Sequence, residues 1–183
     1  MQIIGVVGSS GSGKTTLIQS LMMHFGALRL EVSTVKHAHH GFDIDRPGKD
    51  SFLHRAAGAK EVLVVSDRRW ALLHECVNEP KLEELLLKMT PVDLIIIEGY
   101  KLSEIPKIEV YRSCLGKARL NVNDQSVFAV VSDDLEASPP AAVFRFNEVE
   151  LIAKSILLNA ESVRTTVRPG TLRTSPGIVG VGS

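Results

Sequence analysis

The chain has 183 residues, of which 44% are hydrophobic and 23% are charged, and these values predict about one folded domain. They exclude a collagen, a coiled coil and a chain that is disordered throughout. Lysine and arginine together number 21, as do aspartate and glutamate, so the chain lacks the overall basic excess of a nucleic-acid-binding protein. The two cysteines, Cys76 and Cys114, are too few for a disulfide scaffold. Because there is neither a long apolar span nor a signal-peptide pattern, we expect a cytoplasmic protein that does not enter a membrane.

Apolar runs of strand length alternate along the chain with segments of helical periodicity. The run at 3–7 is typical of a strand buried on both faces, and the apolar stripe at 18–25 indicates a helix. Further strands are expected at 30–36, 61–66, 94–97, 108–111 and 127–131, with 69–73 as a hairpin partner of 61–66, and further helices at 51–57, 80–89 and 151–158. This alternation predicts an α/β fold with a mostly parallel sheet, in which ligands bind at the carboxyl ends of the strands.

The composition changes near the end of the chain. Residues 162–183 contain no acidic and no aromatic side chain, and they are rich in glycine, proline, serine and threonine. Such a composition cannot bury a core. We therefore expect one domain over residues 1–159, followed over 160–183 by a tail that is disordered or non-native.

The strongest motif is GSSGSGKT, which fits the phosphate-binding pattern G-x-x-x-x-G-K-[ST] and lies between an expected strand and an expected helix. Its glycines allow consecutive backbone N–H groups to point at phosphate oxygens, and the helix adds its positive end. Lys14 is expected to reach the β- and γ-phosphates of a nucleoside triphosphate, and the Thr15 hydroxyl to bind Mg²⁺. The predicted phosphate-binding residues are Gly8, Ser9, Ser10, Gly11, Ser12, Gly13, Lys14, Thr15 and Thr16.

Such a loop requires an acidic partner, and Glu98 directly follows the most apolar run of the chain, at 94–97. Its carboxylate is a candidate ligand of Mg²⁺, direct or through water, and a candidate catalytic group. Gly99 would let the backbone pass close to the γ-phosphate. The alternative is that Glu98 only caps a strand at the surface.

Three of the six histidines, His37, His39 and His40, gather in the loop after the strand expected at 30–36, and Asp43 and Asp45 follow them. Three interpretations stay open. The loop is a switch beside the γ-phosphate or a binding loop for a polar heterocycle, it is a transition-metal site, or it is a plain solvated loop. Both aspartates are candidates to position Mg²⁺ or the attacking water, and Asp45 is the candidate catalytic residue.

A possible base-recognition element follows the strand expected at 127–131, which leads into Ser132 and Asp133. An aspartate at this position can accept hydrogen bonds from the N1–H and N2–H₂ groups of guanine. The chain contains no N-K-x-D motif, so its residues alone leave the choice between guanine and adenine open.

Together these motifs resemble the molybdopterin-guanine dinucleotide biosynthesis protein B family. The resemblance covers about residues 1–158 and is carried by the phosphate loop, VKHAHH with DID (35–45), PGKDS (47–51), HRAAGA (54–59), RWAL (69–72), IIEGYK (96–101) and IEVYR (108–112). It implies a three-layer P-loop NTPase fold, GTP and Mg²⁺ as ligands, at most weak GTPase activity, and a homodimer.

The resemblance also implies an adapter role in making or delivering the guanine-dinucleotide form of the molybdenum cofactor. The implied partners are molybdopterin or its guanine dinucleotide and the enzymes of molybdenum-cofactor biosynthesis. On this basis His37, His39, His40 and Asp43 form a switch loop or a pterin-binding loop.

Two other functions share the phosphate loop: a small-molecule kinase, and a metal-delivery GTPase that uses the histidine-rich loop. A kinase usually has a lid with several arginines, whereas this chain offers Arg68 and Arg69 beside the isolated Arg112 and Arg119. A metal-delivery GTPase usually has a long histidine tract, which is also missing here. The adapter is therefore the favoured interpretation.

Overall fold

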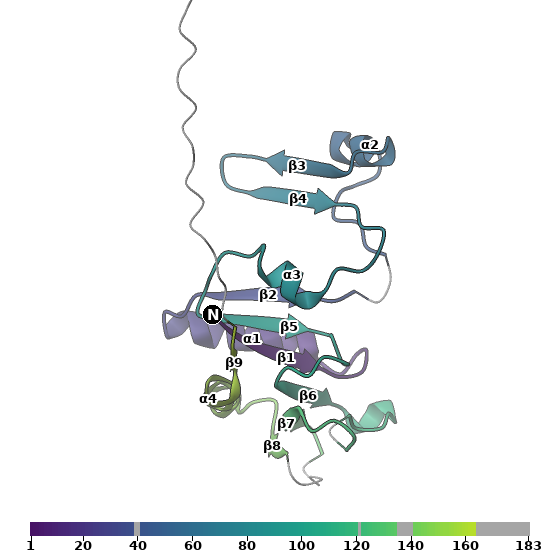
Figure 1. The fold of residues 1–183 in the computed structure, drawn as a ribbon. Helices are drawn as coiled ribbons and strands as arrows, with labels where there is room; N and C mark the ends of the chain where they lie inside the picture. Colours follow the sequence, from purple (N-terminus) through teal and green to yellow (C-terminus); the bar gives the residue numbers. More distant parts are fainter. Residues whose placement is uncertain (39–40, 121, 135–140, 164–183) are drawn as a thin grey trace, which may run out of the picture.

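The computed structural model describes residues 1–38, 41–120, 122–134 and 141–163, and in this part a seven-stranded sheet forms the centre (Figure 1). Six strands follow the order β2-β5-β1-β6-β7-β8, and every neighbouring pair among them is parallel. They are β1 (Gln2–Val7), β2 (Val32–Lys36), β5 (Leu94–Glu98), β6 (Lys107–Tyr111), β7 (Val127–Ser132) and β8 (Ala142–Phe144). The mostly parallel sheet predicted from the sequence is confirmed.

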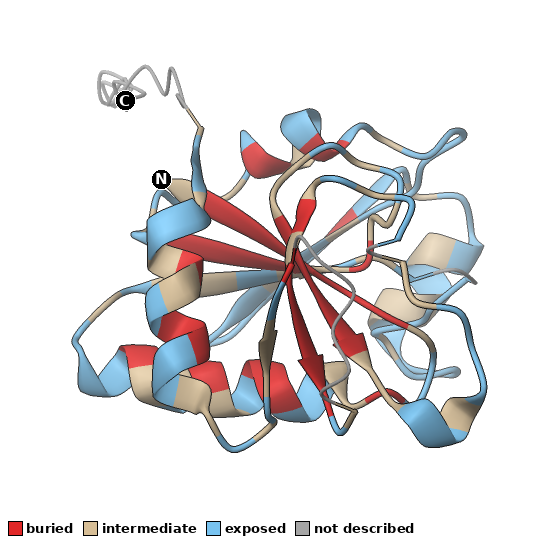
Figure 2. Ribbon diagram, turned by 90° about the horizontal axis from the view of Figure 1, so that it is seen from below, coloured by how far each residue is buried: buried red, intermediate tan, exposed pale blue. Residues whose placement is uncertain are grey.

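Helices lie on both faces of this sheet, so the fold has three layers. In Figure 2 the central strands are mostly buried, and the helices around them expose their outer surfaces. On one face, α1 (Lys14–Ala27) and α4 (Val149–Asn159) pack on side chains such as Ile4 and Val6 of β1. On the other face, α3 (Leu82–Leu86) packs on Ile3 and its neighbours. The alternation along β1 distributes its apolar side chains between two cores because successive strand residues point to opposite faces.

A separate arm, residues 41–78, projects beyond the β2 edge of the sheet (Figure 1). It holds α2 (Asp50–Ala56) and an antiparallel hairpin of β3 (Glu61–Val65) and β4 (Trp70–His74), which confirms the predicted hairpin. One hairpin face carries the buried Val62, and α2 contacts β3. The opposite face carries two cross-strand pairs, Leu63 with Leu72 and Val65 with Trp70, all exposed.

The ordered sheet continues past the expected domain boundary at residue 159. The short strand β9 (Glu161–Ser162) pairs antiparallel with the start of β1, and the Val163 N–H donates to the Met1 carbonyl oxygen at 2.9 Å. Val163 also packs against the core that contains Ile3. The described structure therefore continues to Val163, because backbone pairing with β1 does not require apolar side chains. Residues 164–183 lie outside the described residues.

In the described part of the chain, no helix has the length and apolar character needed to cross a membrane.

Truncation tests the role of β9. Ending the chain after Asn159 removes the pairing with β1 and the burial of Val163, which together contribute about 1–2 kcal/mol and about 2–6 °C in melting temperature. Ending it after Val163 keeps both interactions, so this second truncation is the control. Thermal unfolding of the two truncated chains should show the first melting below the second. Equal melting temperatures would contradict a stabilising role for β9.

Candidate functional site

The phosphate loop leaves β1 at a point where the backbone passes directly against β6. Gly8 has a φ of 147°, and a Cβ atom there would lie 2.2 Å from the Val110 carbonyl oxygen and 2.9 Å from Ser12 Oγ. Only glycine permits so close an approach at this φ. The first glycine of the motif is therefore required by the packing of β1 against β6.

Two further glycines give the loop its curl. Gly11 and Gly13 have φ values of 79° and 100°, and Gly13 is the N-cap of α1. The Ser12 N–H donates to the Ser9 carbonyl oxygen at 3.2 Å and closes the turn. The first turn of α1 carries no acidic side chain, so none of its own residues neutralises its positive end. Backbone N–H groups and a helix N-terminus together make a geometry suited to an anion.

Lys14 folds back over this loop. Its Nζ donates to the carbonyl oxygens of Ser9 at 2.8 Å and Gly8 at 3.1 Å. Partial burial lowers the pKa of Lys14, while the charge of Glu98 acts in the opposite direction. The Lys14 ammonium therefore lies at the loop, close enough to feel the charge of Glu98, the predicted acidic partner of the loop.

Glu98 ends β5 in register with Val6 of β1 and Lys36 of β2, at the carboxyl edge of the sheet. Its Oε1 lies 3.9 Å from Lys36 Nζ. Thr15 is exposed in the first turn of α1. A carboxylate and a hydroxyl are the hard oxygen ligands that Mg²⁺ prefers, and Mg²⁺ usually keeps several waters, so Glu98 and Thr15 fit this ion. Over the described ranges, no group of three or more His, Cys, Asp or Glu side chains could hold a metal.

The ends of β2 and β5 are tied together beside Glu98. The His37 N–H donates to the Glu98 carbonyl oxygen at 2.9 Å, and the His37 ring stacks on Tyr100 with the ring centroids 4.3 Å apart. Gly99 has a φ of 99°, and a Cβ atom there would lie 2.8 Å from His37 Cβ. His37 Nε2 lies 2.8 Å from Glu79 Oε1. Of the predicted histidine loop, His37 is therefore placed against the backbone of the acidic element.

The two aspartates of the predicted histidine loop both contact an arginine of the arm. Asp43 and Asp45 each have an oxygen close to Arg55 Nη2, at 2.6 Å and 2.9 Å, and Asp45 also contacts Arg55 Nε at 3.4 Å. These contacts hold both carboxylates in the arm, so a role at Mg²⁺ would require the cluster to open. His39 and His40 lie outside the described residues, and their roles stay predictions.

The ends of β7 and β8 border a pocket of about 390 Å³. Its lining residues are Ser132, Asp133, Arg145, Phe146 and Asn147. The pocket adjoins the phosphate loop, because a Cβ atom on Gly13 would lie 3.4 Å from Phe146 Cε1. The Arg112 guanidinium stacks on the Phe146 ring, 3.8 Å from its centroid. Sequence reasoning had selected Ser132 and Asp133 but missed the three residues that follow β8, for which the apolar run at 141–144 was the available signal.

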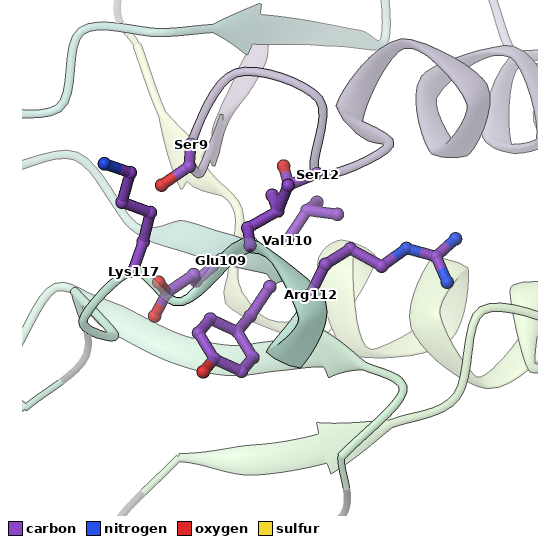
Figure 3. Close-up of a pocket in the computed structure, with 8 residues that line it drawn as sticks. Ser9, Ser12, Glu109, Val110, Arg112 and Lys117 are labelled. Carbon is purple, nitrogen blue, oxygen red and sulfur yellow. The ribbon is translucent and has the colours of Figure 1, made fainter.

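A second, narrow crevice lies beneath the loop (Figure 3). Ser9 and Ser12 line it from the loop, and Glu109 lines it from β6. Glu109 is buried and accepts a hydrogen bond from the Leu120 N–H at 2.8 Å. In Figure 3, Arg112 extends to the side opposite Ser9, toward the start of α1. The buried carboxylate thus anchors the segment after β6 below the loop.

The model of the family described as molybdopterin guanine dinucleotide synthesis protein B matches residues 3–133. The chain belongs to this family. It is 38% identical to the molybdopterin-guanine dinucleotide biosynthesis adapter protein of Escherichia coli (strain K12), over 81% of this chain and 87% of the relative. It is 37% identical to the adapter protein of the same name from Haemophilus influenzae, over 72% of this chain and 74% of that relative. A crystal structure of molybdopterin-guanine biosynthesis protein B superposes with a TM-score of 0.68 at 28% identity, over 85% of this chain and 98% of that one. The predicted three-layer fold of the P-loop NTPase kind is confirmed.

The packing at Gly8 makes a stability prediction with an internal control. Gly8→Ala combines an unfavourable φ with a steric clash against Val110, which together cost about 4 kcal/mol and about 10 °C in melting temperature. Gly11→Ala meets only Leu115 Cδ2 at 4.0 Å, so it costs about 1 kcal/mol from its φ alone. Thermal unfolding should rank the two variants in this order. A Gly8 variant as stable as the Gly11 variant would contradict the packing argument.

Proposed function

We propose that this chain is a GTP-binding adapter that acts in making or delivering the guanine-dinucleotide form of the molybdenum cofactor. The observation that carries the proposal is the phosphate loop, whose backbone curls over the unneutralised N-terminus of α1 beside Lys14 and Glu98. Membership of the adapter family supplies the cellular context, with molybdopterin or its guanine dinucleotide and the biosynthesis enzymes as partners.

In this proposal each group at the loop has one task. The loop N–H groups and the end of α1 bind phosphate oxygens. The Lys14 ammonium moves from the carbonyl oxygens that it contacts now to the β- and γ-phosphates. Thr15 and Glu98 hold Mg²⁺, which neutralises charge on the phosphates.

Slow hydrolysis follows from the placement of the carboxylates. Asp45, the predicted group for positioning water, is held by Arg55 at 2.9 Å. Glu98 then has to neutralise the charge of Mg²⁺, so it is a poor base for removing a proton from the attacking water. We therefore propose GTPase activity that is weak and dependent on Mg²⁺.

Arginine placement favours the adapter over a kinase. Arg68 and Arg69 belong to the hairpin turn of the arm, where the Ser66 N–H donates to the Arg69 carbonyl oxygen at 2.8 Å. Arg112 and Arg119 stack on Phe146 and Tyr111. Arg112 and Arg119 are therefore engaged in stacking, and Arg68 and Arg69 in a turn of the arm, which favours the adapter over a kinase that clamps phosphates with arginines.

We also propose that two copies of the chain associate through the arm. An isolated two-stranded hairpin is marginally stable in water, yet here two adjacent cross-strand pairs on one hairpin face are apolar and exposed, by 71% at Val65 and 67% at Trp70. A second copy would cover this face with the same face, which is the arrangement of a twofold dimer. The sequence resemblance implies a homodimer, so we propose a second copy of the chain as the partner that covers this surface.

Lys14→Ala tests the phosphate loop. The variant should lose measurable binding of GTP with Mg²⁺ in isothermal titration calorimetry, because a charge-assisted phosphate contact is removed while no core contact is lost. Lys154→Ala on the exposed side of α4 is the matched control and should bind like the unmodified chain. Unchanged affinity in the Lys14 variant would contradict the assignment.

Glu98→Gln tests the metal role. The amide still accepts a hydrogen bond but no longer balances the cation, so the gain in GTP affinity on adding Mg²⁺ should shrink by about tenfold. Affinity measured in excess EDTA should stay unchanged. An equal loss with and without Mg²⁺ would assign Glu98 a structural role instead.

Trp70→Glu tests the dimer surface. Light scattering during size-exclusion chromatography should give the mass of a dimer for the unmodified chain and of a monomer for the variant, because a charge within the exposed Val65–Trp70 pair opposes its burial. Leu158→Glu, a change at another exposed leucine, should leave the dimer intact. A monomeric unmodified chain would reject the proposed interface.

A further inference from the structure

We propose that the buried Lys107 is a positioning residue, whose ammonium fixes the loop between β5 and β6, residues 99–106, at the γ-phosphate side of the nucleotide site. This inference rests on the proposed function, because the loop begins directly after Glu98, the carboxylate assigned there to Mg²⁺. It adds a residue outside the phosphate loop and the metal ligands, and it predicts how the chain distinguishes GTP from GDP.

Lys107 is a charged side chain in the interior of the sheet. It is the first residue of β6, it is only 1% exposed, and it lies in register with Gly5 of β1. A Cβ atom on Gly5 would lie 2.5 Å from Lys107 Cγ, so the glycine leaves the room that the lysine side chain occupies. Burial of an ammonium is unfavourable unless the charge is paired and the N–H donors have acceptors. The contacts of Lys107 therefore indicate its role.

The Lys107 ammonium binds the β5–β6 loop by its backbone. Its Nζ donates to the Lys101 carbonyl oxygen at 2.9 Å and also to the Ser103 carbonyl oxygen. Its charge is balanced by Asp124, which precedes β7 and places Oδ2 2.7 Å from the same nitrogen. An ammonium has three N–H donors, and these three oxygens provide an acceptor for each. Lys107 thus ties the loop to the chain segment that leads into β7.

The loop needs this attachment because it begins with unfavourable backbone angles. Gly99 and Tyr100 have φ values of 99° and 48°, and a non-glycine residue keeps such a φ only where its surroundings hold it. The Tyr100 ring is held by stacking on His37, and the Tyr100 carbonyl oxygen accepts from the Ser103 N–H at 3.0 Å and from Ser103 Oγ at 2.8 Å. Lys107 holds the far end of this turn through Ser103. Loss of the ammonium would therefore release one of the two ends that hold Tyr100.

The start of the loop lies beside the groups assigned to the γ-phosphate. Gly99 follows Glu98, and its N–H donates to the Val6 carbonyl oxygen at 3.1 Å, at the end of β1 that leads into the phosphate loop. Burial lowers the pKa of Lys14 most strongly, and the charge of Lys101 lowers it further. Lys101 therefore brings a second positive charge close to the lysine assigned to the β- and γ-phosphates. A fixed loop supports the phosphate that GTP has and GDP lacks.

The alternative is that Lys107 only neutralises Asp124 and supports the fold. In that case its loss would weaken the binding of GTP and GDP by the same factor, because both nucleotides use the phosphate loop. The ratio of the two affinities separates a positioning role from a purely structural one.

The test is Lys107→Met, which removes the charge and keeps the length of the side chain, with the Kd of GTP and of GDP measured by isothermal titration calorimetry in Mg²⁺. GTP should bind about tenfold more weakly, and GDP should stay within about twofold of the unmodified chain. Lys154→Met, which removes an exposed lysine of α4, is the matched control and should change neither Kd. An equal loss for both nucleotides, or an unchanged GTP affinity, would overturn the positioning role while the proposed function stands.

Two further measurements decide the matter if the Lys107 variant does not fold. Asp124→Asn keeps the carbonyl acceptors of the ammonium but removes its counter-charge, so it should lower the preference for GTP over GDP by a smaller factor. In the unmodified chain without nucleotide, the Ser103 amide should exchange slowly with deuterium, because the turn is already held. Fast exchange at Ser103, or an unchanged preference in Asp124→Asn, would overturn the inference. Absence of GTP binding to the unmodified chain would overturn the proposed function as well.

Discussion

The candidate site depends on the contact between Gly8 and the Val110 carbonyl oxygen. A Cβ atom on residue 8 would lie only 2.2 Å from that oxygen, far inside van der Waals contact, so β1 and β6 can adopt their parallel register only with glycine at this position. The turn that follows then directs the loop back over β1 and begins α1 at Lys14. Apolar side chains hold both partners of this contact in place, because Val6 and Val110 belong to the same core. Burial of the central sheet thus determines the shape of an exposed polar loop.

The same sheet edge gives the site two chemically different sides. Toward β5 and β2, Glu98 and the stacked pair of His37 and Tyr100 present a carboxylate and rings. Toward β7 and β8, Asp133 and Phe146 border a pocket large enough for a ligand. A phosphate loop between an acidic side and a pocket with a stacking surface is suited to a nucleotide that binds with Mg²⁺ at one end and its base at the other. The arm remains outside this arrangement and offers an apolar surface of its own.

Local patterns allowed much of this architecture to be predicted. The apolar runs at 3–7 and 94–97, the loop motif and the hairpin at 61–73 depend on neighbouring residues, and the structure confirms each element. Contacts between residues far apart in the chain could not be predicted in this way. β9 forms only because β1 offers a free length of backbone, and Asp45 is positioned by Arg55, whose approach no spacing rule indicates. The strand β8, and with it Phe146, was missed for another reason: the apolar run at 141–144 signals it locally, but the strand is only three residues long.

The central claim is that phosphates bind to the backbone N–H groups of this loop. The most direct measurement is a nuclear magnetic resonance titration of the ¹⁵N-labelled chain with a non-hydrolysable GTP analogue and Mg²⁺. The account predicts that the largest amide shifts fall within residues 8–16, since hydrogen bonds to phosphate act on these N–H groups first. Binding of the analogue that leaves the amides of 8–16 unchanged, or that shifts mainly the amides of the arm, would contradict it.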